Sequence, residues 1–250
     1  MLQPFISYAF NSTIWRLEID EICGILVLEL RDQQDKRVSF AAVDLKTGEK
    51  YFDDHTTPER WMTGLEAIYD GVILLHHYKH ESGPEHKAIV AVDARTSQQK
   101  WSNYSLTFDH LSTNGPICYN ANIQPVKLML ADIATGQLLR PYADTDKPLQ
   151  NNIVVPDMMS STQSPLEHFG YEAYGNIVHC LNHNNYRIVS LHALEGKVLQ
   201  QHLFIMNGNH TVYHDLLNTD IQKLQPEAFV LHQNSLIYIK NKAELKVINL

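Results

Sequence analysis

Short runs of apolar residues recur along the whole chain, and their length and β-rich content predict strands rather than helices. The clearest stretch is residues 61–78, where two such runs flank Asp70-Gly71, a pair typical of a hairpin turn. After a polar segment, a third run extends from Lys87 to Asp93, and a fourth ends at Trp101. Residues 61–101 therefore predict a meander of antiparallel strands. Residues 58–69 also allow a helix by their apolar spacing, but the Asp-Gly turn that follows at once favours a strand.

A strand–turn–strand unit with an Asp and a Gly in its turn is repeated in the chain. In this unit an apolar strand ends at Asp, whose carboxylate can accept hydrogen bonds from N–H groups of the turn. A Gly then supplies the positive φ that hairpin turns require, and a second strand leaves the turn. Ser97 takes the place of Gly in one copy. The copies are residues 42–52, 91–101, 130–139 and, with a weaker match, 190–199.

Two further strand-like runs precede each copy. They are residues 14–20 and 24–30, 62–69 and 71–78, 105–111 and 115–120, and 169–174 and 176–181. A last unit, at residues 227–232, 235–240 and 244–250, lacks its fourth strand, whereas residues 5–10 form a spare strand before the first unit. Pairing the spare strand with the last unit would close a ring and remove two exposed sheet edges.

Four-stranded meanders that recur at about 40–50 residues, with insertions, are typical of β-propellers. We therefore predict an all-β fold: a five-bladed β-propeller closed by pairing of the N- and C-terminal strands, as a single domain over residues 1–250. Two segments do not fit the repeat. Residues 143–165 are rich in Asp, Pro, Asn, Ser and Thr and predict an inserted loop, and residues 214–224 predict a short surface helix.

Two resemblances follow from these motifs. The Ala-x-Asp-x-x-Thr-x-x-x-x-Trp pattern at residues 91–101 resembles the blade motif of quinoprotein-like (PQQ-type) propellers, in which the Trp packs between blades. The chain is too short for their eight blades, so their quinone is not expected here. The stretch from Trp61 to Asp93, with Gly64, Asp70-Gly71 and His86, is similar to an uncharacterised domain-of-unknown-function family of Bacteroidetes. We expect this resemblance to cover nearly the whole chain. This second resemblance supports the propeller and implies no activity.

Composition and charge narrow the function classes. The net charge of −8 gives no support for binding to nucleic acid or an anionic membrane. We expect a cytoplasmic monomer without a membrane span, because no signal-like or membrane-spanning run is present. Cys23, Cys118 and Cys180 are too widely spaced for a zinc motif and are expected to be free thiols. No cofactor is predicted.

Carboxylates at equivalent positions of several units form the first candidate site. Glu66 and Glu172 share a Gly-x-Glu-Ala context, and Glu18 and Glu227 lie at comparable points. If these residues lie on innermost strands, several carboxylates could face a central channel, favour a cationic ligand and raise each other's pKa. The alternative is that each Glu pairs with a nearby Lys or Arg or faces solvent.

Histidines and tryptophans supply the other candidates. His76 and His80 lie about 13 Å apart along one strand, too far to share a metal, so a site would need histidines from different blades, such as His76 or His77 with His179. No metal site is predicted, and the alternative is that these histidines are structural. Trp61 could stack on a flat ligand, whereas Trp101 occupies the packing position of the motif.

Three functions remain open at this point. The first is a non-catalytic module that binds a small molecule or a protein near Trp61, Glu66, His76, His77, Glu172 and His179. The second is a hydrolase or lyase acting on a carbohydrate or peptide-like substrate, with Glu66 and Glu172 as acid and base about 5–10 Å apart. The third is an interaction platform with an exposed apolar patch.

Overall fold

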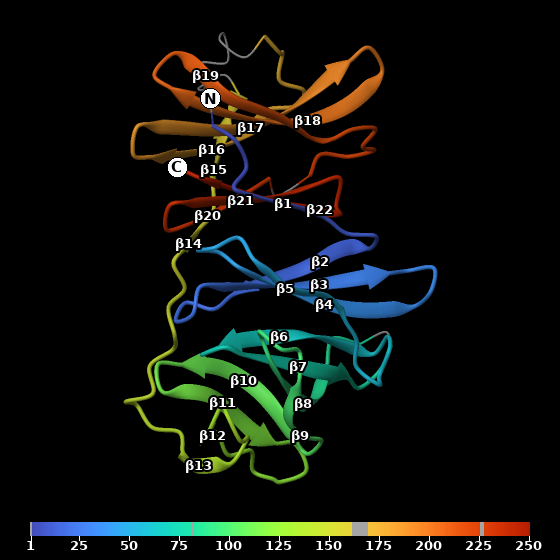
Figure 1. The fold of residues 1–250 in the computed structure, drawn as a ribbon, viewed down its shortest axis with the longest axis vertical. Helices are drawn as coiled ribbons and strands as arrows, with labels where there is room; N and C mark the ends of the chain where they lie inside the picture. The colour runs from blue at the N-terminus through green and yellow to red at the C-terminus, as the bar shows by residue number, and fades with distance from the viewer. Residues whose placement is uncertain (1, 82, 162–169, 226–227) are drawn as a thin grey trace. The chain divides into compact units, whose positions relative to one another are not determined.

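The chain forms five antiparallel β-sheets, and the part that the structure describes contains no α-helix. The computed structural model describes residues 2–81, 83–161, 170–225 and 228–250 (Figure 1). The sheets fall into two compact units. Residues 12–151 make a three-sheet unit, and residues 1–11 with 152–250 make a two-sheet unit. The described residues include no helix with the length and apolar character needed to cross a bilayer.

The three-sheet unit consists of four-stranded meanders in chain order. Each meander matches one predicted repeat, so the strand prediction for residues 62–69 is confirmed over the helical alternative. The strands are β2 (Thr13–Ile19), β3 (Ile25–Asp32), β4 (Arg37–Asp44) and β5 (Lys50–His55); β6 (Thr63–Tyr69), β7 (Val72–Tyr78), β8 (His86–Asp93) and β9 (Gln99–Asn103); and β10 (Leu106–Ser112), β11 (Gly115–Asn120), β12 (Met129–Ala131) and β13 (Leu138–Pro141).

The Asp of each repeated turn accepts the predicted hydrogen bonds. Asp44 Oδ1 accepts from the backbone N–H of Lys46 at 2.7 Å and of Thr47 at 3.0 Å. Asp93 and Asp132 accept equivalent bonds from the Thr three positions later. Burial alone would raise the pKa of these carboxyls, but the hydrogen bonds hold it below the ordinary value. These Asp carboxylates therefore stabilise the turns, and we do not assign them to a ligand site.

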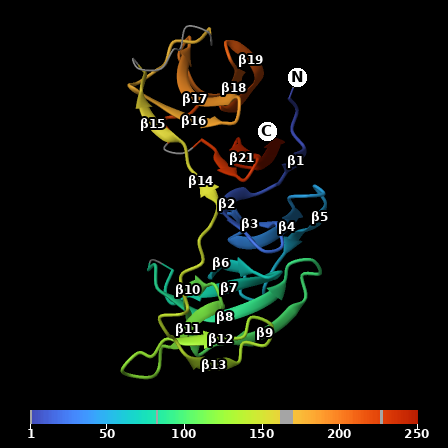
Figure 2. The ribbon, with the colours of Figure 1, turned by 90° about the vertical axis from the view of Figure 1, so that its left-hand side faces the viewer.

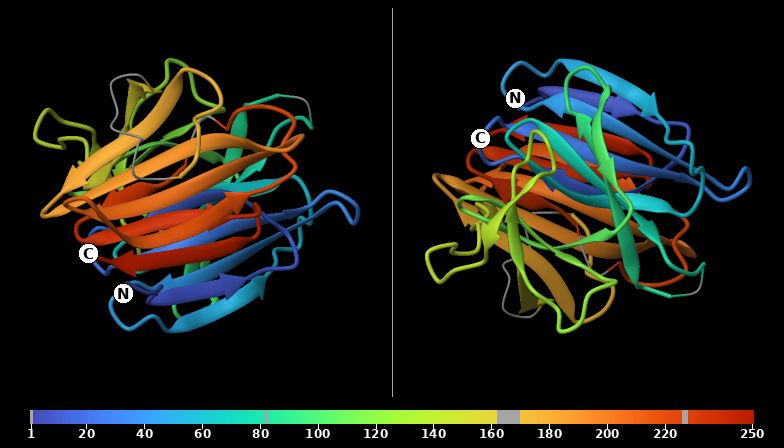
Figure 3. Two further views of the ribbon diagram at one scale, coloured as in Figure 1. Left: turned by 90° about the horizontal axis from the view of Figure 1, so that it is seen from above. Right: turned by 90° about the horizontal axis from the view of Figure 1, so that it is seen from below.

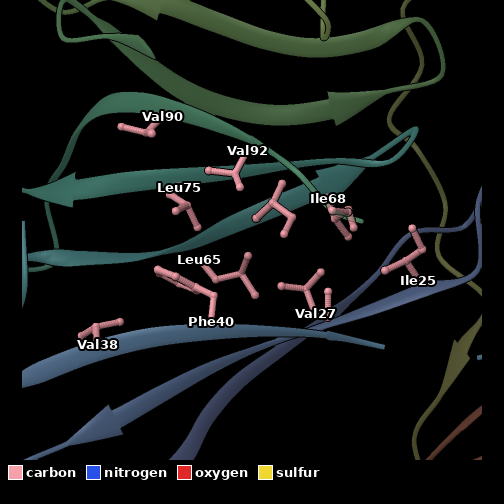
Figure 4. Packing of buried hydrophobic residues seen from close by; sticks show 12 residues of the cluster. Ile25, Val27, Val38, Phe40, Leu65, Ile68, Leu75, Val90 and Val92 are labelled. Atoms are coloured by element: carbon pink, nitrogen blue, oxygen red, sulfur yellow. The ribbon is translucent and has the colours of Figure 1, made fainter. Parts of the chain in front are cut away.

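Adjacent sheets of the three-sheet unit pack through apolar side chains. Between the β2–β5 and β6–β9 sheets, Val27 and Phe40 face Leu65 and Leu75 in a fully buried cluster (Figure 4). Toward the third sheet, the Trp101 indole N–H donates to the Ile133 carbonyl at 2.8 Å. A Cβ at Gly136 would come within 2.5 Å of the Trp101 ring, so only Gly fits there. Trp101 therefore packs between two sheets, as the quinoprotein-like motif implied.

The two-sheet unit contains the predicted pairing of the chain ends. The first strand pairs antiparallel with the last, with Ile6 opposite Val247 (Figures 2 and 3). A bond network joins the two sheets, because Asp215 accepts from Tyr238 at 2.8 Å and from Lys240 at 2.6 Å. The strands are, in sheet order, β15 (Asp157–Ser160), β16 (Ile177–His183), β17 (Tyr186–Glu195), β18 (Val198–Asn207) and β19 (His210–Asn218); and β1 (Ile6–Ala9), β22 (Glu244–Asn249), β21 (Ser235–Lys240), β20 (Val230–His232) and β14 (Ile153–Val154).

Three sequence predictions for the two-sheet unit are wrong. The predicted loop at residues 143–165 contains β14 and β15, each of which pairs along the edge of a sheet. The predicted helix at 214–224 is strand β19 as far as Asn218, and Leu217 of this strand packs in the core. The predicted strand at 169–174 is absent from its described part, where only Ala173 makes an isolated bridge, to Ala193. Phe169 and Glu227 lie outside the described residues.

Candidate functional site

Glu66, His76 and His86 meet on one sheet of the three-sheet unit. They come from the neighbouring strands β6, β7 and β8. One carboxylate oxygen, Glu66 Oε2, lies 2.9 Å from Nδ1 of His76 and 2.9 Å from Nδ1 of His86. The two imidazole rings stack on each other, with centroids 3.5 Å apart and planes 9° from parallel. The three side chains are thus held in a single cluster.

Local breaks in the strand ladder bring these residues together. Leu65 and Ala67 pair with consecutive residues of β7, so Glu66 is the extra residue of a β-bulge. The carbonyl of Glu66 accepts a hydrogen bond from Arg16 at 3.1 Å. On β8, the register shifts again, and the buried residue Ala88 has a φ of 62°. A left-handed Ala costs about 1–2 kcal/mol, so the surrounding packing holds this distortion two residues from His86.

His76 is the most deeply buried member of the cluster. Its side chain is 1% exposed, against 11% for Glu66 and 28% for His86. Neither ring nitrogen of His76 has a hydrogen-bond partner in the part of the chain that the structure describes, because the approach to Glu66 lacks hydrogen-bond geometry. Gly64 makes room for the ring, since a Cβ there would lie 2.7 Å from Nε2 of His76. A buried polar ring without a well-formed hydrogen bond is costly unless another group satisfies it.

The electrostatics of the cluster favour an ionised Glu66. Burial alone would raise the pKa of this carboxyl, but the neighbouring His76 and His86 hold it below the ordinary value. Burial and the nearby His76 lower the pKa of His86, which favours its neutral form. An ionised carboxylate can act as a base or as a ligand for a cation. It is poorly suited to the general-acid half of the hydrolase hypothesis.

Bulges recur on the first strands of all three sheets in this unit. The extra residue is Trp15 on β2, Glu66 on β6 and Asp109 on β10. These strands are neighbours, because β6 contacts both β2 and β10. Burial raises the pKa of the Cys118 thiol to about 12, and the charges of both Asp109 and Glu66 add to this, so the two carboxylates act on one region. Each of these three neighbouring strands therefore has one bulged residue.

We expected neighbouring carboxylates to raise each other's pKa, and Glu18 shows this only in part. Burial raises the pKa of Glu18, and repulsion from Glu66 adds to this effect. However, Arg16 binds Glu18 through two hydrogen bonds of 2.8 and 2.9 Å. Glu18 is therefore an ion-paired residue, as the alternative interpretation proposed.

Trp61 is part of an aromatic box around an arginine. The Arg31 guanidinium lies 5.2 Å from the Trp61 ring, 5.4 Å from the Trp15 ring and 5.7 Å from the Tyr78 ring. Arg31 also forms a buried ion pair with Glu29 at 2.6 Å. Trp61 reaches the cluster only indirectly, because Tyr78 lies edge-on to His76 and His86. Since Arg31 fills the box, Trp61 is held as a packing residue.

The remaining predicted site residues are not part of the cluster, and two of them belong to the two-sheet unit. His77 is on the opposite face of β7, with its ring 5.9 Å from that of Tyr104. Glu172 and His179 belong to the two-sheet unit, where Glu172 is exposed and His179 is buried on β16. Burial, together with neighbouring His179 and His202, lowers the pKa of His192 to about 4. His179 is thus part of a separate group of buried histidines.

Sequence reasoning missed His86 as a site residue. His86 lies opposite Tyr78 in the β7–β8 hairpin, and Tyr78 shares a face with His76. Counting back from Asp93 with an unbroken hairpin register would place His86 opposite Lys79, on the other face of β7, because only the register shift near Ala88 brings it opposite Tyr78. The bulges at Glu66 and near Ala88 cannot be recognised from the residue pattern.

One family model matches part of the chain. Residues 19–101 match a domain of unknown function (DUF4905). The predicted resemblance to a domain-of-unknown-function family is thus confirmed over residues 19–101, which include Glu66, His76 and His86, and not over nearly the whole chain. No curated protein matches the chain.

Solved structures give distant similarities. BamB from Moraxella catarrhalis aligns over 100% of both chains with 8% identity and a TM-score of 0.37. Kuenenia stuttgartiensis hydrazine synthase aligns over 89% of this chain and 64% of its own, with 11% identity and a TM-score of 0.30. The Dos1 propeller aligns over 99% of this chain and 95% of its own, with 8% identity and a TM-score of 0.25. TM-scores this low do not establish a shared fold.

Proposed function

We propose that the chain is a closed five-bladed β-propeller, a single domain that works as a non-catalytic binding module. Its ligand binds at the bulged first strands of the three-sheet unit, against Glu66, His76 and His86. Five antiparallel sheets and the pairing of the first strand with the last support the propeller. We place the protein in the cytoplasm as a monomer; that Cys23, Cys118 and Cys180 form no disulfide supports a reducing compartment.

The recurrent bulge carries the proposal for binding. A bulge re-aims a side chain out of the ladder, and such bulges are common beside functional sites. Here three neighbouring strands have one each, and the middle bulge holds a carboxylate against two histidines. The fold has a structural explanation for Asp44, Trp101 and Trp61, but none for a His76 ring that is buried without a well-formed hydrogen bond.

A thermal-shift screen tests this proposal. The wild-type chain is screened against neutral sugars, short peptides and quinones in the presence of EDTA, and against metal ions without it. A ligand that binds the folded state raises the melting temperature by mass action. We expect at least one compound or ion to raise it, and Glu66→Gln to abolish that shift.

His77→Gln is the matched control, because His77 lies on the same strand but on the opposite face. Its shifts should equal those of the wild type. The proposal is wrong if every shift survives in Glu66→Gln, or if no member of either set shifts the wild type.

A further inference from the structure

The donor atoms at the cluster have the composition of a transition-metal site. One ring nitrogen of His76, one ring nitrogen of His86 and a carboxylate oxygen of Glu66 all lie within 4.8 Å of one another. Two imidazole nitrogens and one carboxylate match the ligand set of many catalytic zinc sites and of non-haem iron sites. Hard cations such as Ca²⁺ and Mg²⁺ prefer oxygen ligands alone. The donors therefore favour a first-row transition ion.

The deep burial of His76 without a well-formed hydrogen bond is a second indication of a ligand. The ring is 1% exposed, and neither nitrogen donates or accepts a hydrogen bond among the described residues. Gly64 gives it the space it occupies. A metal at Nδ1 would satisfy one nitrogen and offset the cost of burying the ring.

The geometry needs a small adjustment to hold an ion. Ligand atoms of a tetrahedral zinc site lie about 3.3 Å apart, given bonds of about 2.0–2.1 Å, whereas the N–O separations here are 2.9 Å. An ion must also lie near the plane of each imidazole, and the two rings are stacked. One ring must turn. His86 is the ring with room to do so, because its side chain is 28% exposed while His76 is enclosed.

We propose that Glu66, His76 and His86 bind a divalent zinc-like ion, with a remaining coordination position open toward solvent on the His86 side. This inference rests on the proposed function and names the ligand class of the same site. Three protein ligands with an open position would let the bound ion hold a water or an anionic group of a second ligand.

Metal binding by the full chain, without a histidine tag, tests the inference. Zn²⁺ affinity is measured by competition with a chromophoric chelator, and Co²⁺ is used to report coordination through its visible absorption. We expect a single tight ion per chain and a low-coordinate Co²⁺ spectrum. Glu66→Gln and His86→Gln should each weaken Zn²⁺ binding by at least about tenfold, since each removes a ligand. Mg²⁺ should not compete.

His77→Gln is again the control and should bind as the wild type does. Equal affinity in wild type, Glu66→Gln and His86→Gln would overturn the inference, as would a wild type with only weak, multiple binding by its fourteen histidines. If both variants fail to fold, the wild-type Co²⁺ spectrum decides, and an octahedral aquo-like spectrum counts against the site. An organic compound that depends on Glu66 in EDTA, without metal binding, would reject the metal and retain the binding module.

Discussion

Gly64 stands where any larger residue would press on the buried imidazole of His76. A Cβ there would lie 2.7 Å from His76 Nε2 and 3.3 Å from Glu29 Oε2. Both atoms belong to buried side chains, so neither can move into solvent. We expect Gly64→Ala to lower the free energy of unfolding by about 1–3 kcal/mol, the usual cost of overpacking a well-filled interior. Urea denaturation measures the loss.

Gly83→Ala is the matched control for this substitution. A Cβ at Gly83 would meet only the His80 Cβ, at 3.9 Å, which is an ordinary contact. Its stability should therefore stay within about 0.5 kcal/mol of the wild type. Equal effects of the two substitutions would show that Gly64 is not required for the placement of His76.

At the scale of elements, the sequence predicted well wherever the signal was local. The Asp and Gly of each turn fix a hairpin through contacts within a few residues, so the meanders of the three-sheet unit are where they were predicted. The Asp70-Gly71 turn has positive φ at both residues, as its composition indicates.

The errors come from contacts between distant segments. The short strand β14 forms by pairing with β20, and β15 forms by pairing with β16. The local residue pattern does not predict either pairing. The cluster was half predicted for the same reason: Glu66 and His76 were chosen, but their meeting with His86 depends on two register shifts. Bulges of this kind are set by packing, so the residue pattern alone could not place them.

Buried histidines of the β15–β19 sheet should make the protein less stable to unfolding in acid. Burial and neighbouring histidines lower the pKa of both His192 and His202 to about 4. The folded sheet thus keeps them neutral, while the unfolded chain takes up protons below its ordinary pKa of about 6.5. Their contribution is complete above about pH 6.5 and is lost as the pH falls toward 4. Each contributes on the order of 1–3 kcal/mol.

Neighbouring titratable groups also shift the pKa of His192 and His202 and so affect the pH dependence of stability. His179 on β16 disfavours a charged His192, and His214 on β19 disfavours a charged His202. Glu195 acts in the opposite direction on His202. Asp215 and Lys240 act with opposite signs on His214, whose pKa is itself lowered chiefly by burial.

Denaturation curves between pH 7 and pH 4.5 measure the effect. We expect His202→Gln to flatten the pH dependence, because it removes one of the two groups. His210→Gln, an exposed position on the same sheet, is the control and should leave the slope unchanged. A wild-type stability that is constant over this range would contradict the argument.

At the scale of the whole molecule, a single closed propeller should have the radius of gyration of one compact domain. The pairing of Ile6–Ala9 with the last strand joins the chain ends within the two-sheet unit, and the chain passes between the units at residues 11–12 and 151–152. A compact single domain of 250 residues has a radius of gyration of about 18 Å. Small-angle X-ray scattering of the full chain should give this value if the five sheets form one ring.

The shape of the scattering curve distinguishes one closed ring from two separate units. Two units joined by flexible crossings would give a larger radius and a pair-distance distribution with a shoulder at long distances, since inter-domain motion spreads the mass. A closed ring gives a single symmetric maximum, because each sheet is then packed on both sides. Calorimetry adds an independent measure: one ring should unfold in a single cooperative transition, whereas separate units would melt in two. Two transitions together with the shoulder would leave the five sheets in place but reject the closed propeller.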